Sequence, residues 1–144
     1  NPGEIATYSF IIYKNGNKIF EKYDVIKEKL LISNNYAEYF ALYNSLKFLL
    51  ENNMNNEEII IKSDSQLLVN QMKGLWKAHK GLYYSLYLKI KELLKEFSNI
   101  KFLWIPREEN KEADKLSKKA YEEYIKLFST SSKNRENCSK NTCY

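Results

Sequence analysis

The sequence predicts an α/β fold in which a mixed β-sheet carries helices on both faces. Three observations predict it: a β-hairpin signal near the start, alternating strand-like and helix-like segments after it, and a length of 144 residues with 44% hydrophobic side chains. A chain of this length forms one domain and can bury about 70% of its unfolded surface without disulfides. The alternation of strands and helices favours a partly parallel sheet, and the hairpin adds two antiparallel strands to it.

The first predicted element is the β-hairpin. Residues 5–13 are rich in β-branched and aromatic side chains, and residues 18–26 form the returning strand. Asn15-Gly16 lies between them. This dipeptide is the strongest short signal for a two-residue hairpin turn, because both central positions of that turn need a positive φ.

Helices and strands are then predicted in alternation. The capping residues Ser33-Asn34-Asn35 precede a helix over 36–51. Residues 58–62 hold three consecutive isoleucines, which favours a strand buried on both faces. Gly74 ends the following helix in the usual position for glycine. The other predicted elements are helices at 67–73, 82–97 and 110–128 and a strand at 100–105.

Composition excludes several protein classes. No run of 18 apolar residues and no signal-peptide pattern is present, so we expect no membrane span and a cytoplasmic location. Residues 129–144 are polar, and we expect a mobile tail after a domain over 1–128. Cys138 and Cys143 lie in this tail, where their spacing fits no firm metal motif. We expect free thiols, with a disulfide as the alternative in a hyperthermophile.

The net charge of +5 is placed unevenly. No acidic residue lies between Asp64 and Glu92. A local basic stretch of this kind favours a polyanionic partner, although an ordinary solvated face is the alternative. The lysines of the stretch are Lys73, Lys77, Lys80, Lys89 and Lys91. The single histidine, His79, lies there too and is interpreted as a surface residue.

Three acidic residues lie where predicted elements meet. Glu38 falls in the first turn of the first helix, Asp64 follows the isoleucine-rich strand, and Asp114 opens the last helix. Ligands gather at the carboxyl ends of strands in α/β sheets, and carboxylates there suit Mg²⁺. Each residue also has a purely structural interpretation. Glu38 could form a capping box with Asn35, Asp64 could cap a helix, and Asp114 could complement a helix dipole.

Four short segments of the chain occur in a characteristic order. They are Asn1-Pro2-Gly3, Ser33-Asn34-Asn35-x-Ala37-Glu38, Ser63-Asp64-Ser65-Gln66 and Trp104-x-Pro106-Arg107-Glu108-x-Asn110-x-x-Ala113-Asp114. Together they resemble type 1 ribonuclease H, most closely its short archaeal-type branch, over roughly residues 1–125. The resemblance implies a ribonuclease H-like three-layer fold with a mixed five-stranded sheet and helices on both faces, and the first of these strands is absent from residues 1–144.

The resemblance implies an endonuclease that hydrolyses the RNA strand of RNA–DNA hybrids and leaves 5′-phosphate and 3′-hydroxyl ends. Glu38, Asp64 and Asp114 match the second, third and fourth of four catalytic carboxylates, which bind two Mg²⁺ or Mn²⁺ ions. Amide side chains suit the 2′-hydroxyls of the hybrid's minor groove, and basic residues suit its phosphates. The implied substrate-binding residues are Asn1, Asn34, Asn35, Gln66, Lys73, Trp76, Lys77, Lys80, Arg107 and Asn110.

The sequence departs from the family pattern at its start. The family's first strand carries the first catalytic Asp and precedes the Asn-Pro-Gly turn, whereas this sequence begins at that turn. We therefore expect upstream residues in the biological protein, and little activity and poor folding for residues 1–144 alone. Two alternatives remain: the ribonuclease H domain of a retroelement reverse transcriptase, and a non-catalytic module that binds hybrid or double-stranded RNA. Trp76 could instead belong to the core. We expect a monomer.

Overall fold

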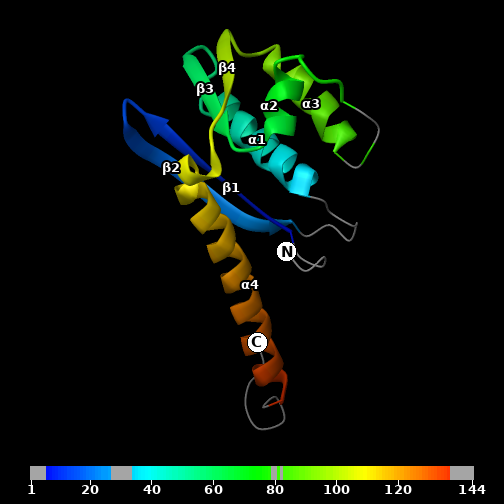
Figure 1. The fold of residues 1–144 in the computed structure, drawn as a ribbon. Helices are drawn as coiled ribbons and strands as arrows, with labels where there is room; N and C mark the ends of the chain where they lie inside the picture. The colour runs from blue at the N-terminus through cyan, green and yellow to red at the C-terminus, as the bar shows by residue number, and fades with distance from the viewer. Residues whose placement is uncertain (1–5, 27–33, 79–80, 82, 137–144) are drawn as a thin grey trace.

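The structure is a computed structural model that describes residues 6–26, 34–78, 81 and 83–136, with side chains excepted for Asn34 and 127–136. The predicted helices and strands are confirmed within a few residues of their predicted bounds. Along the chain they are β1 (Ala6–Lys14), β2 (Asn17–Ile26), α1 (Asn34–Glu51), β3 (Glu58–Ser63), α2 (Gln66–Met72), α3 (Tyr84–Leu94), β4 (Asn99–Trp104), the 3-10 turn η1 (Arg107–Glu109) and α4 (Lys111–Glu136) (Figure 1).

The hairpin and the end of α2 follow the local sequence signals. Asn15 and Gly16 have φ values of 53° and 81°, so the turn has the two positive φ angles that Asn-Gly predicts. Gly74 has a φ of 79° directly after α2, which confirms it as the helix-ending residue. α4 differs from its predicted end at residue 128, since it continues to Glu136.

The described strands form two separate sheets with four strands, one fewer than the single five-stranded sheet that the resemblance implies. β1 and β2 pair antiparallel, and β3 and β4 pair parallel, with four strands in all. Lys14 at the end of β1 forms a 2.9 Å ion pair with Glu57, which immediately precedes β3. β1 and β3 therefore run in opposite directions, and no described strand bridges them.

A cleft of about 920 Å³ separates the two sheets. One wall is formed by β1 and the other by β3, and α1 contributes apolar side chains to its floor. The lining includes residues 9–14 of β1, all of β3, and Ala41, Leu42, Ser45 and Leu49 of α1.

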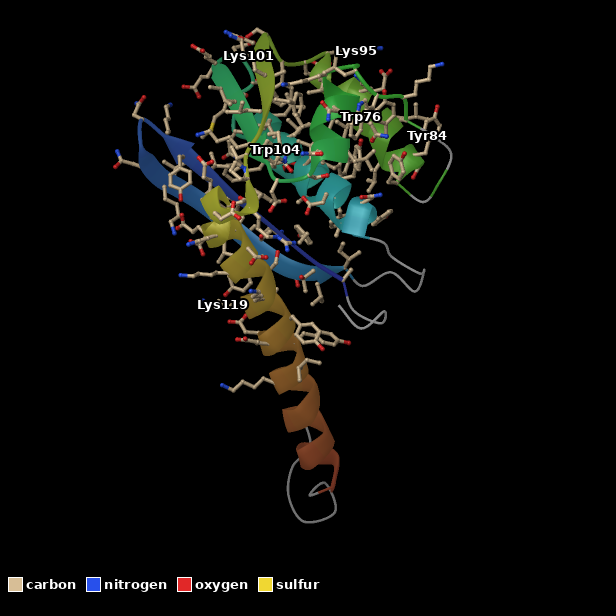
Figure 2. The ribbon with its side chains drawn as sticks, in the orientation of Figure 1. Trp76, Tyr84, Lys95, Lys101, Trp104 and Lys119 are labelled. Carbon is tan, nitrogen blue, oxygen red and sulfur yellow. The ribbon has the colours of Figure 1, made fainter. Side chains whose placement is uncertain are left out.

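The outer face of the β3–β4 sheet is exposed. Ile60 is 52% exposed and Leu103 is 44% exposed, and the neighbouring Lys101 points into solvent (Figure 2). The prediction that the isoleucine-rich strand is buried on both faces is therefore wrong. Ile59 and Ile61 pack against the core, whereas no described helix covers the other face.

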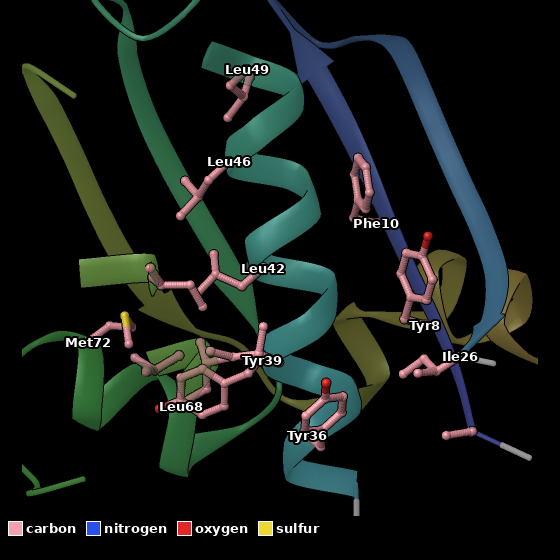
Figure 3. Packing of buried hydrophobic residues seen from close by; sticks show 14 of the residues in the cluster. Tyr8, Phe10, Ile26, Tyr36, Tyr39, Leu42, Leu46, Leu49, Leu68 and Met72 are labelled. Atoms are coloured by element: carbon pink, nitrogen blue, oxygen red, sulfur yellow. The ribbon is translucent and has the colours of Figure 1, made fainter. Parts of the chain in front are cut away.

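The hydrophobic core is built around α1. Tyr39 and Leu46 are fully buried, and the apolar side of this helix lies between the two sheets (Figure 3). Tyr8 of β1 faces α1, whereas the adjacent Ser9 faces α4 and bonds to it. Helices thus cover both faces of the β1–β2 sheet, as predicted. Among the described residues no helix is long and apolar enough to cross a membrane.

Candidate active site

The carboxylate of Glu38 is half-buried near the other predicted site residues. Its pKa is raised to about 7, first by burial and then by the negative charges of Asp64 and Asp114, whereas the Arg107 guanidinium opposes this shift. The charges of Asp64, Arg107 and Asp114 are therefore close enough to act on the Glu38 carboxylate. The prediction that Glu38 lies in the first turn is wrong, because α1 begins at Asn34. Asn35 lies inside the helix, which rules out a capping box between these two residues.

Asp64 follows β3 at the carboxyl end of the parallel β3–β4 pair. Its neighbour Ser65 caps α2, accepting a 3.2 Å hydrogen bond from the Leu68 amide. The interpretation of Asp64 as the helix cap is therefore wrong, which leaves its carboxylate available for other chemistry. The indole Nε1 of Trp104 donates to the Asp64 carbonyl oxygen over 3.1 Å and ties the end of β3 to β4.

Asp114 lies in the first turn of α4, as predicted. It forms a 3.4 Å ion pair with Lys118, one turn further along the helix. The start of α4 is held by the hairpin, because the Ser9 hydroxyl donates to the Ala113 carbonyl oxygen and accepts from Ser117 over 2.9 Å. The sequence prediction did not include Ser9, whose signal is a small hydroxyl residue between Tyr8 and Phe10 in a strand of mostly large side chains.

The three carboxylates suit divalent cations by their chemistry, since they are oxygen ligands whose mutual repulsion a cation would relieve. Within the described ranges, however, no group of three or more His, Cys, Asp or Glu side chains is close enough to hold a metal ion. Asp114 lies on α4, which is bonded to the β1–β2 sheet, whereas Asp64 follows β3 in the other sheet. The three predicted metal ligands therefore lie in the same region of the molecule, but their carboxylates are not close enough together to coordinate one ion.

The basic loop, which we define as residues 73–78, follows α2 at the protein surface. Lys73 and Lys77 are exposed, Leu75 is 69% exposed and Trp76 is 48% exposed (Figure 2). The alternative that Trp76 belongs to the core is therefore wrong. A surface indole between lysines suits stacking and phosphate contacts with a nucleic acid.

The structure describes only some of the other predicted substrate-binding residues. Asn35 and Gln66 are exposed at the start of α1 and α2, and Arg107 and Asn110 lie in and just after η1. The remaining predictions fall outside the described residues or side chains. These are Asn1, Asn34, Lys80, His79, Cys138 and Cys143, and with them the turn at residues 1–3.

Comparison with known proteins decides the family. Residues 11–120 match a family model described as reverse transcriptase-like. The chain belongs to the reverse transcriptase-like family. One relative is the uncharacterized protein YpeP of Bacillus subtilis, 32% identical over 117 residues, which are 81% of this chain. The chain spans about half of that curated relative, since the match covers 52% of it.

The solved structures that resemble this chain include ribonucleases H. Ribonuclease H1 of the halophilic archaeon Halobacterium salinarum superposes with a TM-score of 0.74 at 26% identity, over 85% of this chain and 92% of that one. LC11 ribonuclease H1, solved in complex with an RNA/DNA hybrid, gives a TM-score of 0.70 at 27% identity, over 84% and 99%. The resemblance to type 1 ribonuclease H is confirmed, and its archaeal-type branch agrees with the first of these structures.

Proposed function

We propose that this protein hydrolyses the RNA strand of RNA–DNA hybrids and leaves 5′-phosphate and 3′-hydroxyl ends. The observation that carries the proposal is the electrostatic influence of Asp64, Asp114 and Arg107 on the Glu38 carboxylate. These residues come from four separate segments of the chain, and the fold is shared with a ribonuclease H1 solved with an RNA/DNA hybrid. A carboxylate whose pKa is raised by burial and by neighbouring negative charge, as for Glu38, is typical of catalytic sites.

Glu38, Asp64 and Asp114 would hold the divalent cations, for which we propose two Mg²⁺ or Mn²⁺ ions. When bound, such ions acidify an attacking water and stabilise the leaving oxygen of a phosphodiester. The three carboxylates would hold these ions at the end of β3 and the start of α4. Arg107 adds a cation beside them, where it would form charge-assisted hydrogen bonds with the cleaved phosphate.

The first test changes one carboxylate to an amide of the same shape. In the full native protein, Asp64→Asn should lower the rate of hybrid cleavage in Mg²⁺ by roughly 100-fold or more, because it removes a metal-binding charge. The fold should persist, since the Asp64 carboxylate does not cap α2. A labelled RNA–DNA hybrid measures the rate.

Asp24→Asn is the matched control for this test. Asp24 is exposed in β2, and its Oδ1 accepts a 2.8 Å hydrogen bond from the Val25 amide, which an Asn Oδ1 can also accept. This variant should cleave at the wild-type rate. Equal rates for Asp64→Asn and wild type would contradict the catalytic assignment.

A second prediction concerns the contribution of Lys77 to substrate binding. Lys77→Ala should weaken hybrid binding for every base sequence and reduce the slope of log Kd against log salt concentration by about 1, the value for one lost phosphate contact. Salt titrations of binding measure the slope. Lys101→Ala, at an exposed position on β4, is the control and should leave the slope unchanged. A wild-type slope for Lys77→Ala would exclude a phosphate contact at this lysine.

A further inference from the structure

A buried glutamine links the helix that carries Glu38 to the basic loop. Gln71 lies near the end of α2 and is 1% exposed, although its side chain is polar. Tyr39, the residue after Glu38 in α1, is fully buried and donates a hydrogen bond from its hydroxyl to Gln71 Oε1. α1 and α2 are therefore joined at this point by a polar contact inside an otherwise apolar core.

The amide nitrogen of the same glutamine reaches the basic loop. Gln71 Nε2 donates to the backbone carbonyl oxygen of Lys77 and to the Tyr83 hydroxyl, each over 3.1 Å. Both hydrogens of the amide group thus have acceptors, and its oxygen has a donor. The rings of Tyr39 and Tyr83 also stack with centroids 5.1 Å apart, which fixes the surroundings of the amide.

The basic loop has little apolar anchoring of its own. Leu75 and Trp76 point outward, and their backbone amides bond to the Asn70 carbonyl oxygen at the end of α2. The Gln71 side chain extends this support further, to Lys77. Because the Gln71 amide is buried, leaving it without its acceptor is costly, so this contact restricts the position of the loop.

We propose that Gln71 is a positioning residue that holds Lys77 and Trp76 where they contact the substrate. Through Tyr39 it also sets the position of the loop relative to the α1 segment that carries Glu38. The inference rests on the proposed function, because it assumes that the basic loop contacts the hybrid. Gln71 makes no described contact with the carboxylates, so its effect is on substrate affinity and not on the chemical step.

The test replaces Gln71 by a side chain of similar length without hydrogen bonds. In the full native protein, Gln71→Met removes all three hydrogen bonds of the amide and should raise KM for the hybrid about tenfold, while kcat stays within about twofold. Val69→Ala is the matched control. Val69 is 1% exposed in the same helix, but its side chain has no bond to the loop, so truncation should lower stability and leave KM unchanged. If Gln71→Met does not fold, Gln71→Asn keeps the amide but shortens its reach, and the same KM change is expected.

A second readout follows the loop without any substrate. Trypsin should cut after the exposed Lys73 and Lys77 at least about fivefold faster in Gln71→Met than in wild type or Val69→Ala, as mass spectrometry would measure. Unchanged trypsin cleavage, or faster cleavage with unchanged KM, would overturn the inference. An equal KM change in Val69→Ala would overturn it as well. If wild type cleaves no hybrid, the proposed function fails, and the trypsin rates still decide whether Gln71 anchors the loop.

Discussion

Extending the chain before Asn1 by one β-strand that enters the cleft should raise the free energy of unfolding by about 3 kcal/mol, the value of burying one or two large apolar side chains. The cleft has a strand edge on each side and apolar side chains of α1 below. Six residues in a strand span about 20 Å, which matches the six residues of β3. Urea unfolding of the extended and original chains measures the difference.

One inserted strand can pair with both β1 and β3, because these two strands run in opposite directions. The Lys14–Glu57 ion pair places the end of β1 beside the start of β3. A strand antiparallel to β1 therefore runs parallel to β3, and also to β4, which is parallel to β3. The two separate sheets would then become one mixed five-stranded sheet, the arrangement that the ribonuclease H resemblance implies.

An Asp in the added strand, at the level of Ser63, should also raise hybrid cleavage by roughly 100-fold or more, because it supplies a fourth carboxylate next to Asp64. The same strand with Asn in place of Asp is the control: it should give the full gain in stability without the gain in cleavage. An extension that leaves the free energy of unfolding unchanged would show that the cleft does not accept a strand.

The elements of this fold follow from local signals, whereas the arrangement of its sheets does not. Asn15-Gly16 and Gly74 determine a turn and a helix end through their own backbone preferences, so the sequence predicts both. Strand pairing depends instead on which edges meet. The isoleucines at 59–61 indicate a strand, but the exposure of Ile60 depends on a covering element elsewhere in the chain.

The candidate site was predictable to a similar degree. The sequence predicts Glu38, Asp64 and Asp114 at element junctions, and in the structure Asp64, Asp114 and Arg107 lie close enough to act on Glu38. The role of Gln71 was missed because a glutamine in a helix is usually exposed. Its signal is its position: it shares the buried face of α2 with Leu68 and Met72, where a polar side chain needs an internal partner.

Changing Glu38 to Gln should stabilise the metal-free protein at pH 8 and abolish hybrid cleavage. Glu38 has a pKa raised from 4.5 to about 7, first by burial and then by Asp64 and Asp114. The folded protein therefore binds the proton more tightly than the unfolded chain does. The stabilisation from protonated Glu38 is complete below about pH 4.5 and is lost as the pH rises through about 7. Gln resembles the protonated form at every pH.

The expected gain at pH 8 in EDTA is at most about 3 kcal/mol, and near pH 4.5 the two proteins should differ little. Urea unfolding at both pH values measures it. In millimolar Mg²⁺ at pH 8 the wild type should instead be more stable than Glu38→Gln. The cation stabilises the ionised carboxylates, and the variant has one fewer of them to bind it. Cleavage should fall by roughly 100-fold or more in the variant. If the variant is no more stable than wild type in EDTA at pH 8, Glu38 is not the buried, repelled carboxylate that a cation would need to neutralise.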